Sequence, residues 1–175
     1  MSFIETHRLL MRTWILPGDL EAARGLFTDA DAQRFYLRRT IADKEISSYV
    51  ERIAADEERE GFGVWPAIEK QSRKLVGACG LSRVADLAGE VEVEWIFAPD
   101  ARNKGYASEA AQAVLTFALG QPNIERVIAL VDPENAPSIA IVNRLGMRYE
   151  RIVRAYKRDL MQYAATGAAK RASPQ

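Results

Sequence analysis

The chain has almost no side chains for thiol or imidazole chemistry, since it holds one cysteine, Cys79, and one histidine, His7. A single cysteine excludes a disulfide within the chain, and a lone thiol is typical of a reducing compartment. We also expect no metal, because a transition-metal site needs a cluster of such ligands. Cys79 lies in the apolar run VGACGL, which favours a small buried side chain over a nucleophile.

The chain also lacks a surplus of charge and a long apolar run. It balances 24 Lys and Arg against 24 Asp and Glu, and its sequence pI is about 6.6. This neutrality argues against a nucleic-acid partner, because such modules usually carry a basic surplus. The N-terminus MSFIETHRLL is too polar for a secretory signal, and no segment approaches the roughly 20 apolar residues that span a bilayer. We therefore expect a cytoplasmic protein with no membrane partner.

What the chain does have is hydrophobic residues at helix and strand spacing, over a length that suits one domain. The predicted helices span residues 20–27, 44–60, 108–119 and 138–145. The predicted strands span residues 8–14, 63–69, 74–84, 90–97, 124–131 and 147–158. This order predicts one mixed α/β domain of the α+β type over residues 1–160, with antiparallel and parallel strand pairs. We expect the tail 161–175 to be disordered.

The segment RNKGYA, residues 102–107, joins a predicted strand to a predicted helix. Backbone N–H groups at a helix N-terminus lack partners and carry positive potential, and a glycine lets them approach an anion closely. Arg102 and Lys104 add positive charge, and the small Ala107 leaves room beside them. The turn thus suits a pyrophosphate, although an ordinary helix start is the alternative for so short a pattern. It matches neither the Walker pattern nor GxGxxG.

With its surroundings, this turn resembles the central motif of the GNAT superfamily of N-acetyltransferases. That motif has the form Q/R-x-x-G-x-G/A, which Arg102, Gly105 and Ala107 match. The segments VEWIFAPDARNKGYASEA and ETHRLLMRTW resemble the branch that contains the ribosomal-protein N-terminal acetyltransferases. NAPSIAIVNRLGM resembles the second motif of that branch, with these residues in register: Asn135, Ser138, Arg144, Gly146 and Met147.

The resemblance covers about residues 5–158. It implies a mostly antiparallel sheet with one splayed parallel pair, flanked by helices, and an acetyl-CoA site. The cofactor's pyrophosphate would lie on the amides of the glycine turn, which are those of Arg102, Asn103, Lys104, Gly105, Tyr106 and Ala107. Its pantetheine arm would pair with the backbone near Ile96, Phe97 and Ala98, where that strand splays from strand 124–131. Splaying exposes backbone N–H and C=O groups that the arm's amides can satisfy.

Acetyl transfer to an amine also needs a base, because alkyl ammonium groups hold their proton at neutral pH. The resemblance favours Glu92, which stands where the branch often has the glutamate of an E-[I/L]-G-Y pattern. Glu94 replaces the glycine of that pattern, so it is an alternative or additional base. The plain alternative is that EVEVE is a half-exposed strand with its glutamates in water. A backbone N–H near Ile96 or Phe97 would stabilise the developing oxyanion.

The departing thiolate benefits from a proton donor. Many superfamily members use a tyrosine at the position that Val142 occupies here, and valine donates nothing. Ser138 is the candidate that the branch suggests, with helix capping as its alternative role, and Tyr149 is a weaker candidate. Asn135 would cap the same helix, contact the pantetheine, or do both.

The acceptor side is poorly marked in the sequence. The residues that fall in its region are Arg34, Tyr36, Arg38, Arg39, Tyr49 and Trp65. A basic cluster could meet an acidic substrate, but it is more often a solvated surface. The resemblance favours a protein N-terminal α-amine as acceptor. The alternatives are a small-molecule amine, such as a polyamine, amino acid or antibiotic, and a non-catalytic acetyl-CoA sensor. The sequence leaves open whether the chain forms a homodimer.

Overall fold

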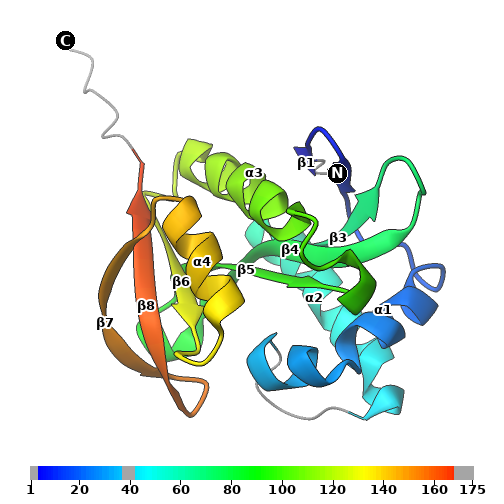
Figure 1. Cartoon of the computed structure of the whole chain (residues 1–175), viewed down its shortest axis with the longest axis horizontal. Helices are drawn as coiled ribbons and strands as arrows, with labels where there is room; N and C mark the ends of the chain where they lie inside the picture. Colours follow the sequence, from blue (N-terminus) through cyan, green and yellow to red (C-terminus); the bar gives the residue numbers. More distant parts are fainter. Residues whose placement is uncertain (1–3, 37–41, 168–175) are drawn as a thin grey trace.

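The structure, a computed structural model, describes residues 4–36 and 42–167 (Figure 1). One eight-stranded sheet runs through it in the order β1-β2-β3-β4-β5-β6-β8-β7. The strands are β1 (Ile4–Glu5), β2 (Leu9–Met11), β3 (Val64–Glu69), β4 (Leu75–Val84), β5 (Glu90–Phe97), β6 (Arg126–Val131), β7 (Arg148–Ala155) and β8 (Arg158–Thr166). Neighbouring strands are antiparallel except β5 and β6, which are parallel. The predicted mixed sheet is confirmed.

Helices cover both faces of this sheet, with α3 and α4 on one face and α1 and α2 on the other (Figure 1). The helices are α1 (Leu20–Phe27), α2 (Ile46–Glu60), α3 (Tyr106–Gly120) and α4 (Ala136–Arg144). Short helical turns are η1 (Ala32–Tyr36), η2 (Asp43–Glu45), η3 (Ala85–Leu87) and η4 (Pro99–Ala101). Each predicted helix is present, with its ends within two residues of the prediction. Within the described ranges, no helix is both long and apolar enough to cross a membrane.

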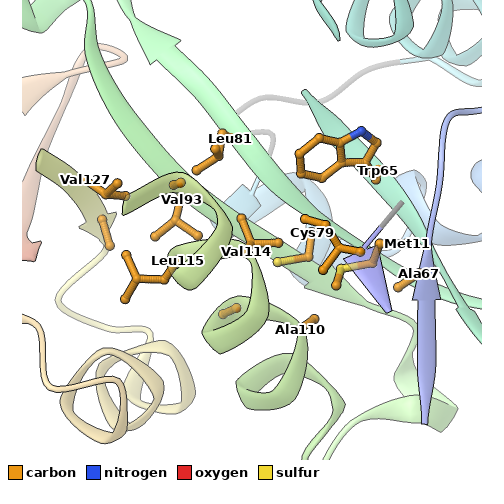
Figure 2. Close-up of a cluster of buried hydrophobic side chains, with 14 of the residues drawn as sticks. Met11, Trp65, Ala67, Cys79, Leu81, Val93, Ala110, Val114, Leu115 and Val127 are labelled. Atoms are coloured by element: carbon orange, nitrogen blue, oxygen red, sulfur yellow. The ribbon is translucent and has the colours of Figure 1, made fainter. Parts of the chain in front are cut away.

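The largest apolar cluster lies between α3 and the sheet (Figure 2). Ala110, Val114 and Leu115 present the buried face of α3, and the alanine lets the helix approach the strands closely. Cys79 and Val93 meet them from β4 and β5. Burying a valine or leucine side chain contributes about 1.5–3 kcal/mol, so this contact fixes α3, and the turn before it, against the sheet.

Side chains along β5 point alternately to the two faces of the sheet, so each residue's place in the strand determines which apolar cluster it joins. Val93 and Phe97 belong to the cluster under α3, whereas Ile96 belongs to the cluster under α1 and α2. Successive side chains of a strand point to opposite faces, so Glu92 and Glu94 share the face of Ile96. The two glutamates therefore lie on the sheet face opposite α3.

The parallel strands β5 and β6 stay paired over a very short length. Among the described residues, their register pairs only Glu92 with Ile128. Antiparallel partners hold β5 to β4 and β6 to β8 over much longer registers. The strands therefore part on the C-terminal side of this pair, as the resemblance implied.

Two strand predictions differ from the structure. The strand expected at 8–14 is shorter and pairs with β1, which the sequence did not indicate. The segment 147–158, expected to be one strand, instead contains β7, which forms a hairpin with β8. The expected end of the domain at residue 160 falls inside β8. The hairpin turns at Tyr156 and Lys157, with φ of 51° and 61°. Glycine or asparagine usually marks such a turn, and neither is present here. Residues 168–175 of the expected tail lie outside the described residues.

Candidate active site

A cavity of about 810 Å³ opens where β5 and β6 part. Its walls come from the second half of β5, the end of β6, the turn before α3, the helix α4 and the helical turn η1. Cavities of this size that gather polar groups from several elements are the usual form of a small-molecule site. The short β5–β6 register is thus the structural cause of the cavity.

The glycine turn forms one end of this cavity. Asn103 and Gly105 have φ of 60° and 81°, and Gly105 is the residue before the first turn of α3. Gly105 also lies against Arg8, since a Cβ built on it would stand 3.3 Å from an Arg8 guanidinium nitrogen. The left-handed backbone at Gly105 turns the chain into α3, so the N-terminal amides of that helix lie beside the cavity. The arrangement suits an anion.

The side chain of Arg102 braces the turn instead of pointing freely into the cavity. Its guanidinium is paired with Asp29 and lies 2.7 Å from the Asp31 carboxylate. Its Nε donates to the carbonyl of Phe97 at 3.0 Å. Arg102 therefore joins the glycine turn to β5 and to the segment that leads into η1, a role that the charge of the motif did not reveal.

Lys104 and Tyr106 both contact Arg8, in the segment before β2. The carbonyl of Lys104 accepts from Arg8 at 2.8 Å, and the Lys104 side chain is exposed. Tyr106 hydrogen-bonds Glu69 through its hydroxyl, and its ring lies under the Arg8 guanidinium. Of the turn's residues, Lys104 alone does not line the cavity.

Arg144 is a cationic side chain at the cavity that the prediction of phosphate contacts did not include. It stands in the last turn of α4, lines the cavity, and donates to the Ser108 hydroxyl of α3 at 2.6 Å. No carboxylate is paired with Arg144 among the described residues. Its position in the second motif was the signal available in the sequence.

The backbone of β5 presents alternate residues to β4 and to the cavity. The N–H of Ala98 donates to the carbonyl of Val76 at 2.9 Å. Hydrogen-bonded pairs alternate along an antiparallel ladder, so the backbone of Ile96 also faces β4. The backbone groups of Trp95 and Phe97 therefore face β6 and the cavity. Of the residues expected to pair with a cofactor arm, Phe97 has its backbone toward the cavity, whereas the backbones of Ile96 and Ala98 are paired with β4.

Glu92 is almost completely buried, with 1% of its surface exposed. Its Oε2 accepts a hydrogen bond from the Tyr156 hydroxyl at 2.8 Å, and Glu92 lines the cavity. The expectation of a half-exposed strand with glutamates in water is therefore wrong for this residue. A buried carboxylate needs hydrogen-bond partners, and no pattern in the sequence indicated that Tyr156 supplies one.

Glu94 lies two residues further along β5, lines the same cavity and is half-buried. The hydroxyl of Tyr36 in η1 is buried beside it. Burial and the charge of Glu94 raise the pKa of Tyr36 well above its usual value, so Tyr36 is a neutral phenol at physiological pH. The cavity therefore brings together both predicted glutamates and a tyrosine of the expected acceptor side.

The start of α4 forms the wall opposite β5. Asn135 caps the helix, because its Oδ1 accepts from the Ser138 N–H at 3.2 Å. Ser138 also lines the cavity, and within the described ranges no hydrogen bond of its hydroxyl is found, so its side chain does not act as the cap. Val142 is buried in the core. Tyr149 is 51% exposed on β7 and does not line the cavity.

Contacts join η1, which lines the cavity, to the segment after β6 and to β8. Arg34 of η1 is paired with Glu134, which follows β6. Arg158 of β8 donates to the carbonyl of Arg34 at 2.8 Å and lies 3.3 Å from Asp132. The expected Trp65 is instead buried in the core under α3. Arg38 and Arg39 lie outside the described residues, and Tyr49 contacts Phe27 in the cluster under α1 and α2.

Cys79 is fully buried in the apolar core, as predicted. Burial and the nearby charge of Glu94 raise the pKa of its thiol far above the usual value. A thiol that stays protonated is a poor nucleophile, and Cys79 does not line the cavity. Among the described residues, no group of three His, Cys, Asp or Glu side chains could hold a metal ion.

A family model and a curated relative both assign the chain to the same family. A family model described as an acetyltransferase (GNAT) domain matches residues 8–148. The chain is 31% identical to the uncharacterised N-acetyltransferase YnaD of Bacillus subtilis over 149 residues, which cover 84% of this chain and 83% of YnaD.

Solved structures give the same fold. An acetyltransferase of the GNAT family from Bacillus anthracis is 28% identical, with a TM-score of 0.79 over 94% of this chain and 98% of that chain. RimL, a ribosomal L7/L12 α-N-protein acetyltransferase solved with coenzyme A, is 15% identical, with a TM-score of 0.79 over 95% of this chain and 98% of that chain. At that identity the likeness to RimL concerns the fold alone.

Proposed function

Because the chain belongs to the GNAT acetyltransferase family, we propose that its cavity transfers the acetyl group of acetyl-CoA to the α-amine of a protein N-terminus. The observation that carries the proposal is the parting of β5 and β6 after Glu92 and Ile128, with the glycine turn at one end and the buried Glu92 at the other. The amides of the glycine turn can bind a phosphate, and Glu92 can accept a proton. Because both line one cavity, they suit a reaction between a phosphate-bearing donor and an amine.

The residues present fit acetyl-CoA, which supplies the activated acetyl group as a thioester. The amides of the turn around Gly105 would hold the pyrophosphate, and the Arg144 guanidinium would add positive charge beside them. The backbone groups of Trp95 and Phe97 would pair with the amides of the pantetheine arm. The N–H of Trp95 is our candidate for binding the oxyanion, because Trp95 is nearer to Glu92 along β5, which leaves the N–H of Phe97 for the arm; both are fixed before the reaction.

Glu92 is the proposed general base. It takes the proton that the amine gives up as the new N–C bond forms and the thioester C–S bond breaks. Glu94, on the same face of β5, is the alternative base. Ser138 is the proposed donor to the departing sulfur, because its hydroxyl lines the cavity and is not used to cap α4.

The resemblance to the ribosomal-protein N-terminal acetyltransferases favours a peptide α-amine as acceptor. A small-molecule amine is the second candidate, favoured by contacts that tie η1 to the segment after β6, since fixed cavity walls suit a compact acceptor. Arg34 is joined to Glu134 and, through its carbonyl, to Arg158.

The test is release of free CoA thiol from acetyl-CoA with a panel of N-terminal peptides, polyamines, amino acids and aminoglycosides. The mass of each product identifies the acetylated nitrogen. Turnover confined to peptides, with the acetyl group on the α-nitrogen, supports the first candidate. Turnover confined to small amines replaces it with the second, and no transfer to any amine overturns the proposal.

A further inference from the structure

Tyr156 stands at the tip of the β7–β8 hairpin, yet its side chain reaches the base proposed for β5. Its hydroxyl donates to Oε2 of Glu92 at 2.8 Å, across 64 residues of sequence. Tyr156 does not line the cavity, so it does not meet substrate or cofactor directly. Any effect of Tyr156 on the reaction therefore passes through Glu92.

The position of the Tyr156 hydroxyl is set by contacts that do not involve Glu92. Its backbone N–H donates to the Asp86 carboxylate of η3 at 2.7 Å. Its ring packs on an apolar cluster that includes Ile128 of β6 and Leu160 of β8. The two-residue turn, with φ of 51° and 61° at Tyr156 and Lys157, aims the side chain back at the sheet. The hydroxyl is thus a prearranged donor.

We propose that Tyr156 is a positioning residue, whose hydroxyl holds Oε2 of Glu92 and so fixes the orientation in which this carboxylate takes the proton of the amine. A buried carboxylate without a fixed donor would turn to find other partners, and its charge would be poorly stabilised. The phenol satisfies Oε2 and orients the carboxylate plane. This inference rests on the proposed function, because it assigns a partner to the proposed base.

Charged and polar groups also face Glu92 from its own strand and from the strands on either side. On its own strand, Glu94 is also an acceptor, and Glu90 is held by Arg126 of β6 at 3.1 Å. Opposite Glu92 on β4 stands Ser82, and opposite it on β6 stands the apolar Ile128. Asp86 accepts from the backbone of Tyr156 and acts on the hairpin.

The experiment compares Tyr156→Phe with the wild type and with Tyr149→Phe, which removes a hydroxyl from the same hairpin at an exposed ring outside the cavity. For Tyr156→Phe we expect kcat/KM to fall about 10- to 100-fold, the range for a hydrogen bond to a charged group. The loss should fall on kcat, with little change in the KM for the amine, because the hydroxyl acts on the orientation of the base and not on substrate binding. Affinity for acetyl-CoA, measured by calorimetry, should not change.

Tyr149→Phe should match the wild type in both kcat and KM. If Tyr156→Phe does not fold, Asp86→Ala serves instead, since it frees the hairpin tip without touching Glu92 and should lower kcat by a smaller factor. An active wild type with an unaltered kcat in Tyr156→Phe overturns this inference and leaves the proposed function intact. A wild type that acetylates no amine overturns both, so the two failures are distinguishable.

Discussion

Glu92 and Ile128 are the register pair that joins β5 to β6, and the strands part directly after it. The parting creates the cavity, and the pair sets a buried carboxylate at its closed end. The parting of β5 and β6 therefore makes room for a cofactor arm and places the Glu92 carboxylate, the proposed proton acceptor, beside it.

Gly105→Glu should abolish acetyl-CoA binding, because it places bulk and negative charge in the anion cradle. A non-glycine residue at φ of 81° also costs about 1–2 kcal/mol of stability. Gly61→Glu is the matched control, since Gly61 has φ of 76° at the end of α2 and does not line the cavity. Calorimetry with acetyl-CoA should show binding to the control and none to Gly105→Glu. Equal affinity in both variants would mean that the cofactor binds elsewhere.

Arg144→Ala should weaken acetyl-CoA binding about tenfold or more, the scale of a charged hydrogen bond. The wild-type affinity should fall with added salt more steeply than that of the variant. The exposed Arg148, on β7, gives the control variant Arg148→Ala, which changes the net charge equally and should keep the wild-type affinity. Indistinguishable affinities for Arg144→Ala and Arg148→Ala would remove Arg144 from the site.

Glu150 should contribute stability that depends on pH. The hydrogen bonds from Arg126 lower the pKa of Glu150 to about 2, well below its usual 4.5. A depressed pKa in the folded state means that the contribution is present above about pH 4.5 and is lost as the pH falls towards 2. Urea unfolding should show Glu150→Gln less stable than the wild type at pH 7, with the gap closing at low pH. A gap that is the same at both pH values would contradict this.

Much of the fold could be predicted from the sequence because periodicity and turn chemistry agreed. The alternation of EVEVEWIF indicated β5, and the spacing of Ala111, Val114 and Leu115 indicated α3. The β7–β8 hairpin could not be seen, because Tyr156 and Lys157 take positive φ without glycine or asparagine. A turn that is stabilised by contacts with distant residues, as this one is, cannot be recognised from the residue types at the turn itself.

The candidate site was predictable where a motif fixed the backbone and unpredictable where distant side chains meet. Gly105 and Asn135 stand where the motifs implied, at the starts of α3 and α4. The sequence could not show that Arg102 forms ion pairs with Asp29 and Asp31. Nor could it show that the Tyr156 hydroxyl donates a hydrogen bond to Glu92. Those contacts join residues far apart in the chain, and composition and spacing describe only near neighbours.

The role of Glu92 as the base is tested by comparing the wild type with Glu92→Gln on an amine that the panel identifies as an acceptor. Turnover and acetyl-CoA affinity are measured on the same samples, and Glu94→Gln is run beside them. We predict that Glu92→Gln lowers turnover by about 10²–10⁴-fold, the usual contribution of a general base, and leaves acetyl-CoA affinity unchanged. Wild-type turnover in Glu92→Gln, with the loss found in Glu94→Gln or in neither variant, would contradict the account.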